Sequence, residues 1–457
     1  MSSIARARQR RSAATRWWFI TWRVLLGATC VLLLASAVYL RAPLSNYFFR
    51  FPRLTHELTA LRAQAAPVQL DDGWGEYRAV IHSHSALSHD SEVPFPSILA
   101  AAKAASVDVV FMTDHCIDKK ADFSLQWDGL HDEVRFIRGW ELHNGLLIWG
   151  LASPATLDCG APLAETAARV EGAGGLTGFG HTEMPRPYDV TAVSAMEIYN
   201  IHTDFLDDKL GRILPQLLMN TWRWPELAIR EIYDRPEAQL KLWDRQNRDR
   251  RMSGFGANDA HQNLGLRLEY TEQGGLWLRQ SSRKSFTDPQ RPVGPFTRWM
   301  LALLFGPLVP GRELVHLDLD PYERSLRYVN THLLAHDNTA EALMDALRSA
   351  RCYVAFNLLA DARGFVFFAE DGPLRATMGE NIAWTPALRL KGEASLPARW
   401  TIVKDGEAIA RVESRTLDWP VPAAGNYRVE LALLVGDEGW LDWIYANPVR
   451  VLSAANR

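Results

Sequence analysis

The chain has 457 residues, too many for one small domain, and so predicts two or three domains of about 150 residues each. Hydrophobic residues make up 47% of it and charged residues 23%, a balance typical of a folded globular protein and not of a disordered or coiled-coil chain. Its four cysteines include no Cys-x-x-Cys pair, which excludes a disulfide-rich scaffold and a zinc ribbon.

The formal net charge of −3 is unevenly distributed along the chain. The first 23 residues hold six arginines and no acidic residue. The rest of the chain therefore contains 44 of the 50 basic residues and all 53 acidic ones. Nucleic-acid binding depends on neutralising phosphates with basic residues. A body this acidic therefore predicts no nucleic-acid partner.

The amino-terminal region predicts a membrane anchor. Val24–Leu40 is an uncharged run of 17 residues, close to the lower limit for spanning a bilayer as a helix. The arginines before it should stay in the cytoplasm by the positive-inside rule. We therefore expect residues 1–22 to be a basic cytoplasmic segment and residues 23–41 to span the membrane once. The main body would then lie outside the cytoplasm, on the periplasmic side in a bacterium.

Two alternatives to a retained anchor follow from the same residues. Ala35-Ser36-Ala37 resembles a small-residue cleavage site, which is compatible with a cleaved signal peptide. A buried core helix fits the terminal position and the flanking charge poorly. Outside this run the chain has three cysteines, an odd number that indicates no particular pairing: Cys116, Cys159 and Cys352.

After a connector over residues 42–70, residues 71–360 alternate between strand-like and helix-like patterns. The predicted strands are Tyr77–Ile81, Val107–Met112, Val134–Ile137, Leu176–Phe179, Ala195–Tyr199 and Met252–Gly256. The predicted helices are Pro96–Ala105, Pro162–Val170 and Gln239–Arg251. Strands that alternate with helices predict an α/β fold with a parallel sheet, open or closed into a barrel.

Residues 361–457 have a different character. The alternating segments Trp400–Lys404, Ala408–Val412 and Tyr427–Val435, with an Asp405-Gly406 turn, predict antiparallel strands in a small all-β sandwich.

Two other stretches are ambiguous. The insertion over 205–238 is compatible with a lid, a dimer surface or helical packing. Trp299–Pro310 is apolar but too short to span a bilayer, and is either a buried core segment or an element that dips into the membrane.

Candidate metal ligands follow five of the predicted strands. They are His82 and His84, Asp114 and His115, Glu141, His181, and Asp259 and His261. The carboxyl ends of parallel strands in an α/β barrel meet on one face, so these side chains would share one pocket. Imidazole and carboxylate ligands without thiolate suit Zn²⁺, Mn²⁺ or Fe²⁺.

The order of these motifs resembles the polymerase and histidinol phosphatase (PHP) superfamily of metal-dependent hydrolases. The matching stretches are His82-Ser83-His84-Ser85, Ser88-His89-Asp90, Thr113-Asp114-His115, Gly139-Trp140-Glu141, Gly180-His181, Met196-Glu197-Ile198-Tyr199-Asn200 and Asn258-Asp259-Ala260-His261. The resemblance implies a distorted (β/α)7 barrel that holds two or three divalent ions. It also implies which residues hold each ion. The first ion would be bound by His82, His84, Glu141 and Asp259, and the second by Glu141 and His181. The third would be bound by His115, His261 and either Asp90 or His89.

The larger PHP proteins that include carbaryl hydrolase-like enzymes, which carry a β-sandwich after the barrel, resemble this chain most. Where family members place a Gly-His pair after the glutamate, this chain has Gly145-Leu146, and His143 is the candidate substitute. Asp114 is expected to orient a ligand or move a proton. Arg138 and Arg186 are candidates for binding a phosphate, against the alternative of solvated surface arginines.

The resemblance implies a membrane-anchored phosphoesterase that activates water with its metal ions and acts on a small phosphate ester. A carboxylester, carbamate or amide hydrolase with the same metal site is an alternative, because both reactions use the same chemistry. A non-catalytic binding protein of the cell envelope is a third. Glu197 and Asn200 are expected to line the pocket rather than to bind metal.

Overall fold

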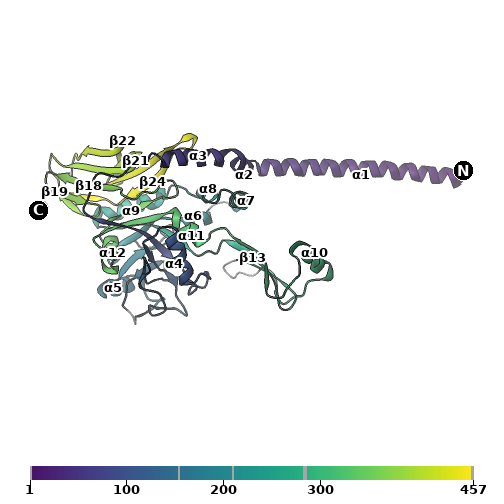
Figure 1. Ribbon diagram of the computed structural model, residues 1–457, viewed down its shortest axis with the longest axis horizontal. Coiled ribbons are helices and arrows are strands. Elements are labelled where there is room, and N and C mark those ends of the chain that lie inside the picture. The colour runs from purple at the N-terminus through teal and green to yellow at the C-terminus, as the bar shows by residue number, and fades with distance from the viewer. Residues whose placement is uncertain (1–2, 153–154, 208–209, 281–285, 454–457) are drawn as a thin grey trace. The chain divides into compact units, whose positions relative to one another are not determined.

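The computed structural model describes residues 3–152, 155–207, 210–280 and 286–453, and shows a mixed α/β protein (Figure 1). The chain divides into two compact units, residues 1–55 with 209–231 and residues 56–208 with 232–457. The first unit is helical, and α3 (Phe51–Arg62) begins in it and ends in the second. Its other elements are α1 (Ser3–Tyr39), α2 (Arg41–Ser45), a π-helical turn (Asn46–Arg50), α7 (Leu210–Asn220) and α8 (Pro225–Arg230).

Helix α1 contains the predicted spanning segment. Its Thr21–Tyr39 stretch has 19 residues, a mean hydropathy of 1.8 and no buried part. At 1.5 Å per residue such a helix is about 28 Å long, close to the thickness of the hydrocarbon core of a bilayer. One helix of the described chain is thus long and apolar enough to cross a membrane, although a signal sequence shares these properties.

The rest of the first unit is held by polar contacts between α2, the π-helical turn and the insertion. The side-chain amide of Asn220 donates to the carbonyl oxygen of Pro43 at 3.3 Å. Arg50 forms an ion pair of 2.7 Å with Glu231. Over residues 210–231 the insertion therefore packs as helices, in agreement with the third of the alternatives that its sequence left open.

The second unit contains all the strands of the described chain. The elements of its first part are β1 (Gly75–Ser83), α4 (Phe95–Ala104), β2 (Val109–Phe111), β3 (Asp114–His115), β4 (Lys120–Asp122), β5 (Gly129–His131), β6 (Val134–Ile137), β7 (Gly139–Glu141), β8 (Leu146–Trp149), β9 (Thr156–Asp158), α5 (Leu163–Gly172), β10 (Leu176–Phe179), β11 (Ala195–Asn200), α6 (Ile201–Asp207), α9 (Glu237–Asp249) and β12 (Ser253–Ala260). Its middle part has β13 (Gly265–Tyr270), β14 (Leu276–Gln280), α10 (Pro295–Phe305), β15 (Arg312–Asp318), α11 (Tyr322–Tyr328), β16 (Asn330–Ala335), α12 (Ala340–Arg348) and β17 (Cys352–Ala355).

The strands that carry the candidate ligands pair in a circuit. β1 is parallel to both β2 and β12, β2 to β6, β12 to β11, and β11 to β10. β7 continues β6 after one residue, and β8 joins β7 to β10 by antiparallel pairing. Within the described residues, the connections from β2 to β6 and from β10 to β11 contain no helix. The α/β class with parallel strands is therefore confirmed, whereas a (β/α)7 barrel stays a prediction.

These strands are buried on both faces, which explains why they read as continuous apolar runs. Ile81 and Phe111 face one core cluster together with Trp149. Their neighbours Val80 and Val110 face a second cluster, to which helices α4 and α11 contribute. Because successive side chains of a strand point to opposite faces, one run of sequence fills both clusters. The buried strands hold the positions of the residues at their ends.

Residues 366–452 form strands and one short 3₁₀ turn (Gly436–Glu438). The strands are β18 (Val366–Asp371), β19 (Leu374–Thr377), β20 (Asn381–Ala383), β21 (Arg389–Lys404), β22 (Glu407–Pro420), β23 (Gly425–Val435), β24 (Gly439–Ala446) and β25 (Val449–Leu452). The predicted Asp405-Gly406 turn joins β21 to β22, and both of its residues have positive φ, as a tight hairpin turn requires. β21 pairs with β18 in its first part and with β23 in its last part. The predicted antiparallel strands are therefore present, although β20 pairs with β25 in parallel, and the β-sandwich stays a prediction.

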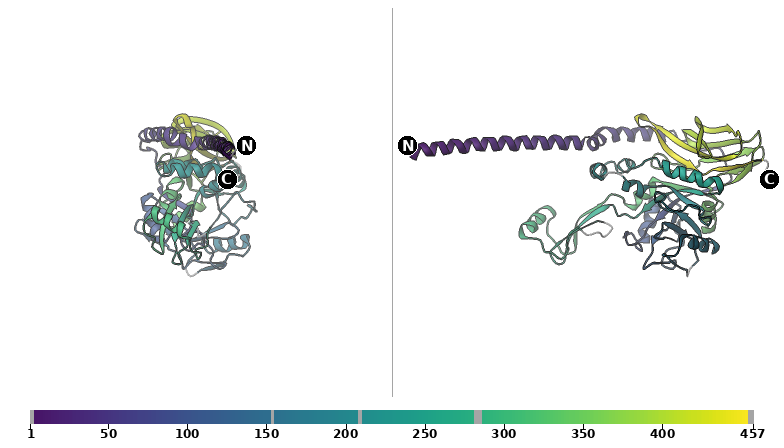
Figure 2. Two further views of the ribbon diagram at one scale, coloured as in Figure 1. Left: turned by 90° about the vertical axis from the view of Figure 1, so that its right-hand side faces the viewer. Right: turned by 180° about the vertical axis from the view of Figure 1, so that it is seen from behind.

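The apolar stretch Trp299–Pro310 is not part of a core. β13 pairs with β14 and with β15, and this three-stranded arm carries α10 between β14 and β15. Within the second unit, the arm extends away from the other strands (Figures 1 and 2). Leu301 is the only buried residue of α10. The interpretation as a buried core segment was therefore wrong, because the strands on either side of α10 carry it away from the core.

Candidate metal centre

The eight residues expected to bind metal lie in one cluster at the strand ends. β1 and the residue after it supply His82 and His84, and β7 supplies Glu141. Each member has a ligand atom within 4.8 Å of those of its group, and the groups share members. The groups are His84, Asp90, His115 and His261; His82, His84 and Glu141; His82, His181 and Asp259; and His202, Asp259 and His261.

Glu141 lies between four imidazoles. Its Oε2 atom is 3.1 Å from Nε2 of His82, 3.4 Å from Nδ1 of His115 and 3.6 Å from Nε2 of His84. Its Oε1 atom is 3.1 Å from Nε2 of His181. Two ligands at the usual bond length on one tetrahedral Zn²⁺ lie about 3.4 Å apart. The spacing of these atoms is compatible with side chains that could bind the same ion.

Asp259 makes a second set of contacts with the imidazoles. Its Oδ1 atom lies 3.1 Å from His84, 3.2 Å from His82 and 3.5 Å from His261. Its Oδ2 atom lies 3.7 Å from Nε2 of His181. The carboxylates of Asp259 and Glu141 thus approach the same imidazoles.

In the group of His84, Asp90, His115 and His261, the carboxylate of Asp90 lies beside the imidazoles, whereas His89 is not a member. Oδ2 of Asp90 is 3.3 Å from Nε2 of both His115 and His261. Oδ1 of Asp90 is buried and has no hydrogen-bond partner among the described residues. The side chain of His89 is 78% exposed. A buried carboxylate oxygen without a partner is costly unless a cation binds it, so the donors of this group fit a metal ion.

Glu197 holds two of the candidate ligands from behind. Its Oε1 atom lies 2.5 Å from Nδ1 of His82, on the side of the ring away from Glu141. Its Oε2 atom accepts a hydrogen bond of 2.6 Å from the backbone N–H of His181 and one of 3.2 Å from Asn200. A carboxylate behind an imidazole fixes its tautomer and its orientation toward a metal.

Asp114 is buried behind the cluster and contacts it through Ser88. Its Oδ1 atom accepts hydrogen bonds from the hydroxyls of Ser85 and Ser88, and its Oδ2 atom accepts one from Gln126. The Ser88 hydroxyl oxygen lies 3.1 Å from Nδ1 of His84. Burial raises the pKa of Asp114, against the lowering effect of these hydrogen bonds. Its position suits the orienting role expected from the sequence.

The other candidate catalytic residues lie outside the four groups. His143 is exposed in the turn between β7 and β8. Arg186 donates to the carbonyl oxygens of Asn144 at 2.8 Å and His181 at 2.9 Å, so it braces the loops around the cluster. Arg138 pairs with Asp128, away from the candidate ligands.

Two residues near the cluster were not expected as ligands. His202, at the start of α6, falls in a group with Asp259 and His261. Glu183 lies 3.3 Å from Nδ1 of His181. His202 comes three residues after Tyr199, where the predicted strand ended. The other candidate ligands were found as imidazoles or carboxylates that follow a predicted strand, and the same criterion would have found His202.

The imidazoles of the cluster carry strongly shifted pKa values. Burial lowers the pKa of His181, but the carboxylates of Glu141 and Glu183 outweigh burial and raise it to about 12. Burial likewise opposes the charge of His261, and Asp259 is the first of the carboxylates that raise its pKa to about 9. Buried carboxylates thus draw positive charge into the cluster. Divalent ions provide such charge and displace the protons from their ligands.

Three candidate ligands have left-handed backbone conformations. The φ angles are 73° at His82, 49° at His181 and 46° at Asp259. Such a conformation costs roughly 1–3 kcal/mol for a non-glycine residue, and it persists where the surrounding structure imposes it. Left-handed residues at the ends of β1, β10 and β12 are compatible with a functional site, although seven other non-glycine residues of the described chain also have positive φ.

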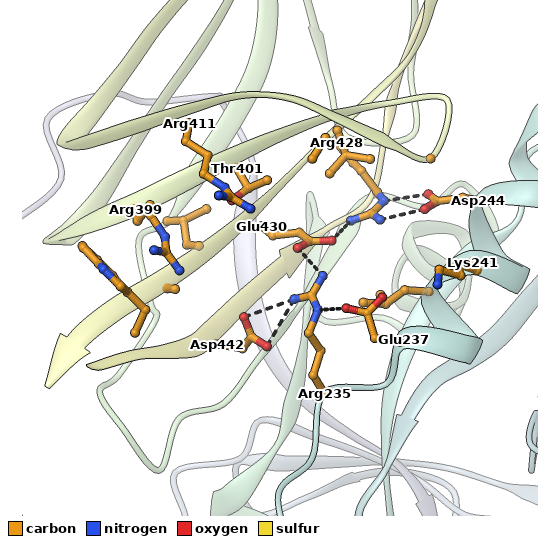
Figure 3. A pocket seen from close by; sticks show the side chains of 17 residues that line it. Arg235, Glu237, Lys241, Asp244, Arg399, Thr401, Arg411, Arg428, Glu430 and Asp442 are labelled. Carbon is orange, nitrogen blue, oxygen red and sulfur yellow. Dashed lines mark hydrogen bonds and ion pairs between the residues drawn. The ribbon is translucent and has the colours of Figure 1, made fainter. Parts of the chain in front are cut away.

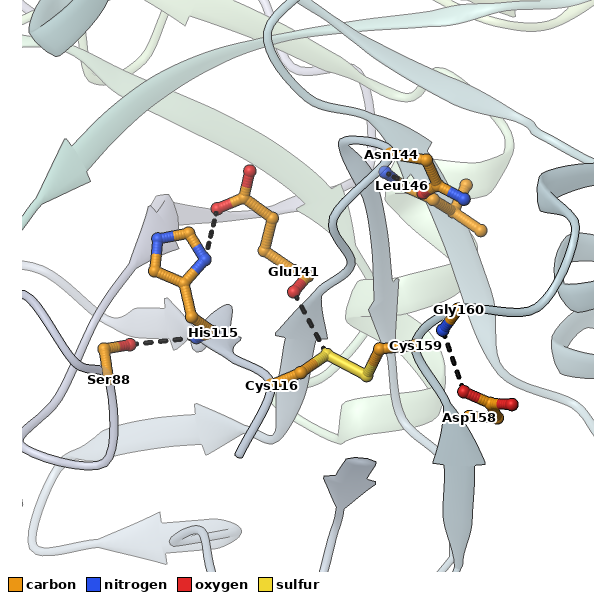
Figure 4. The surroundings of a disulfide bond; sticks show 9 residues. All are labelled: Ser88, His115, Cys116, Glu141, Asn144, Leu146, Asp158, Cys159 and Gly160. Carbon is orange, nitrogen blue, oxygen red and sulfur yellow. Dashed lines mark hydrogen bonds and ion pairs between the residues drawn. A yellow bond between two sulfur atoms is a disulfide. The ribbon is translucent and has the colours of Figure 1, made fainter. Parts of the chain in front are cut away.

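A disulfide bond lies directly beside the cluster (Figure 4). Cys116, which follows His115, is bonded to Cys159 after β9. The sulfur of Cys116 lies 3.5 Å from the carbonyl oxygen of Glu141. The cysteine count gave no sign of this pair, because Cys352, which made the number odd, is buried as a free thiol.

A separate hollow of about 570 Å³ lies between α9 and strands β21–β24 (Figure 3). Its carboxylates are engaged in ion pairs. Glu430 contacts both Arg428 and Arg235 at 2.7 Å, and Asp244 contacts Arg428 at 2.7 Å. Among the described residues that line this hollow there is no histidine or cysteine. Its side chains therefore join α9 to the carboxy-terminal strands and do not resemble a metal site.

No family model matches the chain, and no curated protein matches it. Among solved structures, it is similar to a two-domain protein from Bacteroides vulgatus that contains a predicted PHP-like metal-dependent phosphoesterase. The similarity covers 84% of this chain and 98% of that protein, with 10% sequence identity and a TM-score of 0.34. A likeness this distant assigns neither a fold nor an activity to the chain.

Proposed function

We propose that the protein is a hydrolase of the PHP type that uses two or three divalent ions, Zn²⁺, Mn²⁺ or Fe²⁺, to cleave a small phosphate ester. One observation carries the proposal. Glu141 and Asp259 each lie within 3.1–3.7 Å of four imidazoles. Carboxylates that bridge sets of imidazoles are suited to a centre of several metal ions.

When bound, the ions would lower the pKa of a water molecule and stabilise the charge that develops on the phosphoryl oxygens. The protein's own residues set the geometry. His82, His84 and Asp259 would hold the first ion, with Glu141 shared between it and the second at His181. Asp90, His115 and His261 would hold the third.

Residues behind the ligands keep the cluster ordered. Glu197 orients His82 through a contact of 2.5 Å, and Asp114 acts on His84 through Ser88. Arg186 fixes the loop that carries His181.

A small hollow next to the cluster offers room for a substrate. It has a volume of about 230 Å³, and Glu183, Asn200 and Thr203 are among its lining residues. Asn200 donates to Oδ2 of Asp259 at 3.3 Å, and the Thr203 hydroxyl lies 3.4 Å from Nδ1 of His181. The polar walls of the hollow therefore continue into the metal cluster.

The location proposed for the hydrolase is outside the cytoplasm. The apolar stretch Thr21–Tyr39 supports a single-pass anchor, with residues 23–41 in the membrane and residues 1–22 in the cytoplasm. The Cys116–Cys159 bond supports the same location independently, because disulfides persist in oxidising compartments. The connector would then be 42–70, the hydrolase domain 71–360 and the β-sandwich 361–457.

Metal analysis and a substrate panel test the proposal together. The purified full chain should hold two or more transition-metal ions and should turn over phosphomonoester or phosphodiester chromogenic substrates. Glu141→Gln should abolish turnover. Glu171→Gln is the control, because Glu171 is a half-buried carboxylate outside the cluster that accepts the backbone N–H and the hydroxyl of Thr177.

Three outcomes contradict the proposal in different ways. Turnover of carboxylesters alone would keep the metal centre but reject the phosphoesterase. Metal content without turnover of any substrate would favour a binding protein. A chain that binds no transition metal at neutral pH would reject the metal centre itself.

A further inference from the structure

Helix α10 exposes a continuous apolar face. Phe296, Trp299, Met300, Leu303 and Leu304 follow the i, i+3, i+4, i+7, i+8 spacing that places side chains on one side of a helix. Phe296 is 73% exposed, Leu303 68% and Leu304 67%. Soluble monomers rarely expose so many large apolar side chains together, so this face requires a partner.

The charge around α10 indicates the chemistry of that partner. Between Asp288 and Glu313 the sequence contains no acidic residue, whereas it contains Arg291, Arg298 and Arg312. In a chain with more acidic than basic residues outside its amino terminus, this stretch is locally cationic. An apolar face with an aromatic residue and flanking arginines is the pattern of a helix that lies in the headgroup layer of an anionic membrane.

The base of the arm is firmly attached next to the metal cluster. Glu92 pairs with Arg267 of β13 at 3.1 Å and with Arg279 of β14 at 3.0 Å. β13 begins four residues after His261. On the returning side, Asp320 accepts the backbone N–H of Leu264 at 2.9 Å. The strands therefore hold α10 as a projecting element, not as a freely hinged loop.

We propose that α10 docks into the headgroup layer of an anionic lipid bilayer, as a membrane contact additional to α1. At 11 residues the helix is too short to span the bilayer, so it lies in the surface with its apolar face toward the acyl chains. The docked arm brings the edge of the second unit that carries His261 toward the membrane surface. This inference is independent of whether the metal cluster is catalytic.

Spin labelling of the full chain in vesicles tests the docking. Leu303→Cys places the label on the apolar face, in a Cys30→Ser background where Cys352 stays buried and the other two cysteines are bonded. Leu374→Cys in β19 is the matched control, because Leu374 is also a leucine and is 62% exposed. In vesicles of phosphatidylglycerol and phosphatidylethanolamine, the label at 303 should lose accessibility to a water-soluble nickel chelate and gain accessibility to oxygen. The control label should stay accessible to the chelate.

A second variant and a second readout keep the test decisive. Adding Leu304→Glu should restore the accessibility of the label at 303 to the chelate, because a buried carboxylate opposes insertion. Equal chelate accessibility at 303 and 374 would overturn the proposal. Dipolar broadening between labels at 303, in detergent as well as in vesicles, would also overturn it by showing that the face pairs with a second copy of the chain. Neither readout depends on hydrolytic activity, so failure here is distinct from failure of the proposed function.

Discussion

Replacing Glu197 with glutamine tests whether a carboxylate behind the ligands supports metal binding. Glu197 contacts Nδ1 of His82 at 2.5 Å and the backbone N–H of His181 at 2.6 Å. Glutamine keeps the shape of the side chain and removes its charge. Hydrogen bonds to charged groups contribute about 1.5–3 kcal/mol, and neutral ones about 0.5–1.5 kcal/mol. If only the hydrogen bond to His82 supports metal binding, removing the charge of Glu197 should weaken the free energy of metal binding by about 1.4 kcal/mol. This corresponds to a metal affinity about tenfold lower.

The assay is a competition titration of metal-free protein with Zn²⁺ or Mn²⁺ against a chelator of known affinity, at constant pH. Thermal unfolding of the metal-free variants shows whether the fold is intact. Glu171→Gln serves as the control, because it removes the charge from a carboxylate that accepts similar hydrogen bonds 2.8–3.0 Å long outside the cluster. We expect weaker metal binding in Glu197→Gln and unchanged binding in Glu171→Gln.

Two results would refute this reasoning. A folded Glu197→Gln variant with the metal affinity of the unchanged protein would show that the orientation of His82 does not depend on the carboxylate. Equal weakening in Glu171→Gln would show that the loss of any partly buried carboxylate loosens the site. In either case the assignment of Glu197 as a positioning residue would be withdrawn.

Four further predictions concern the cluster and its surroundings. Asp90→Asn should lose one bound ion by elemental analysis, while His89→Asn keeps all of them. Equal metal content in both variants would contradict metal binding by Asp90 with His115 and His261. Metal loading at about pH 7.5 should release the proton that His261 holds through its pKa of about 9, and calorimetric heats that do not vary with the ionisation enthalpy of the buffer contradict this. Because this pKa in the folded protein lies above the ordinary value of 6.5 for histidine, the stability it contributes to the metal-free protein is fully present below pH 6.5 and is lost as pH rises through about 9. A urea midpoint that does not fall over this window argues against it. Replacing Cys116 and Cys159 with alanine opens a loop with a sequence separation of 43, which should cost about 4 kcal/mol, and an unchanged midpoint would reject that estimate.

The sequence predicted the cluster well because its signal repeats. All of the expected ligands except Asp90 followed a recognisable buried strand, and parallel strands deliver their ends to one edge. Val134–Ile137 and Leu176–Phe179 form strands with the predicted bounds. Strand order, together with the resemblance to the PHP superfamily, therefore predicted that His82, Glu141 and Asp259 lie together.

Other features depend on long-range geometry that sequence patterns do not encode. The pairing of Cys116 with Cys159 requires the approach of two loops 43 residues apart. The exposure of α10 depends on the arm that carries it, because the same apolar residues would suit a core. The choice between His89 and Asp90 required the direction of each side chain. Local pattern gives the elements and their order, whereas these three features follow from tertiary placement.

The left-handed residues at His82, His181 and Asp259 have a consequence for laboratory evolution of this scaffold. Glycine has no Cβ and adopts such φ angles without penalty. A chain selected only for heat resistance should therefore accumulate glycine at these positions, and would gain stability while losing its candidate metal ligands. Persistence of histidine and aspartate under that selection would mean that these side chains contribute more to the fold than their backbone conformation costs.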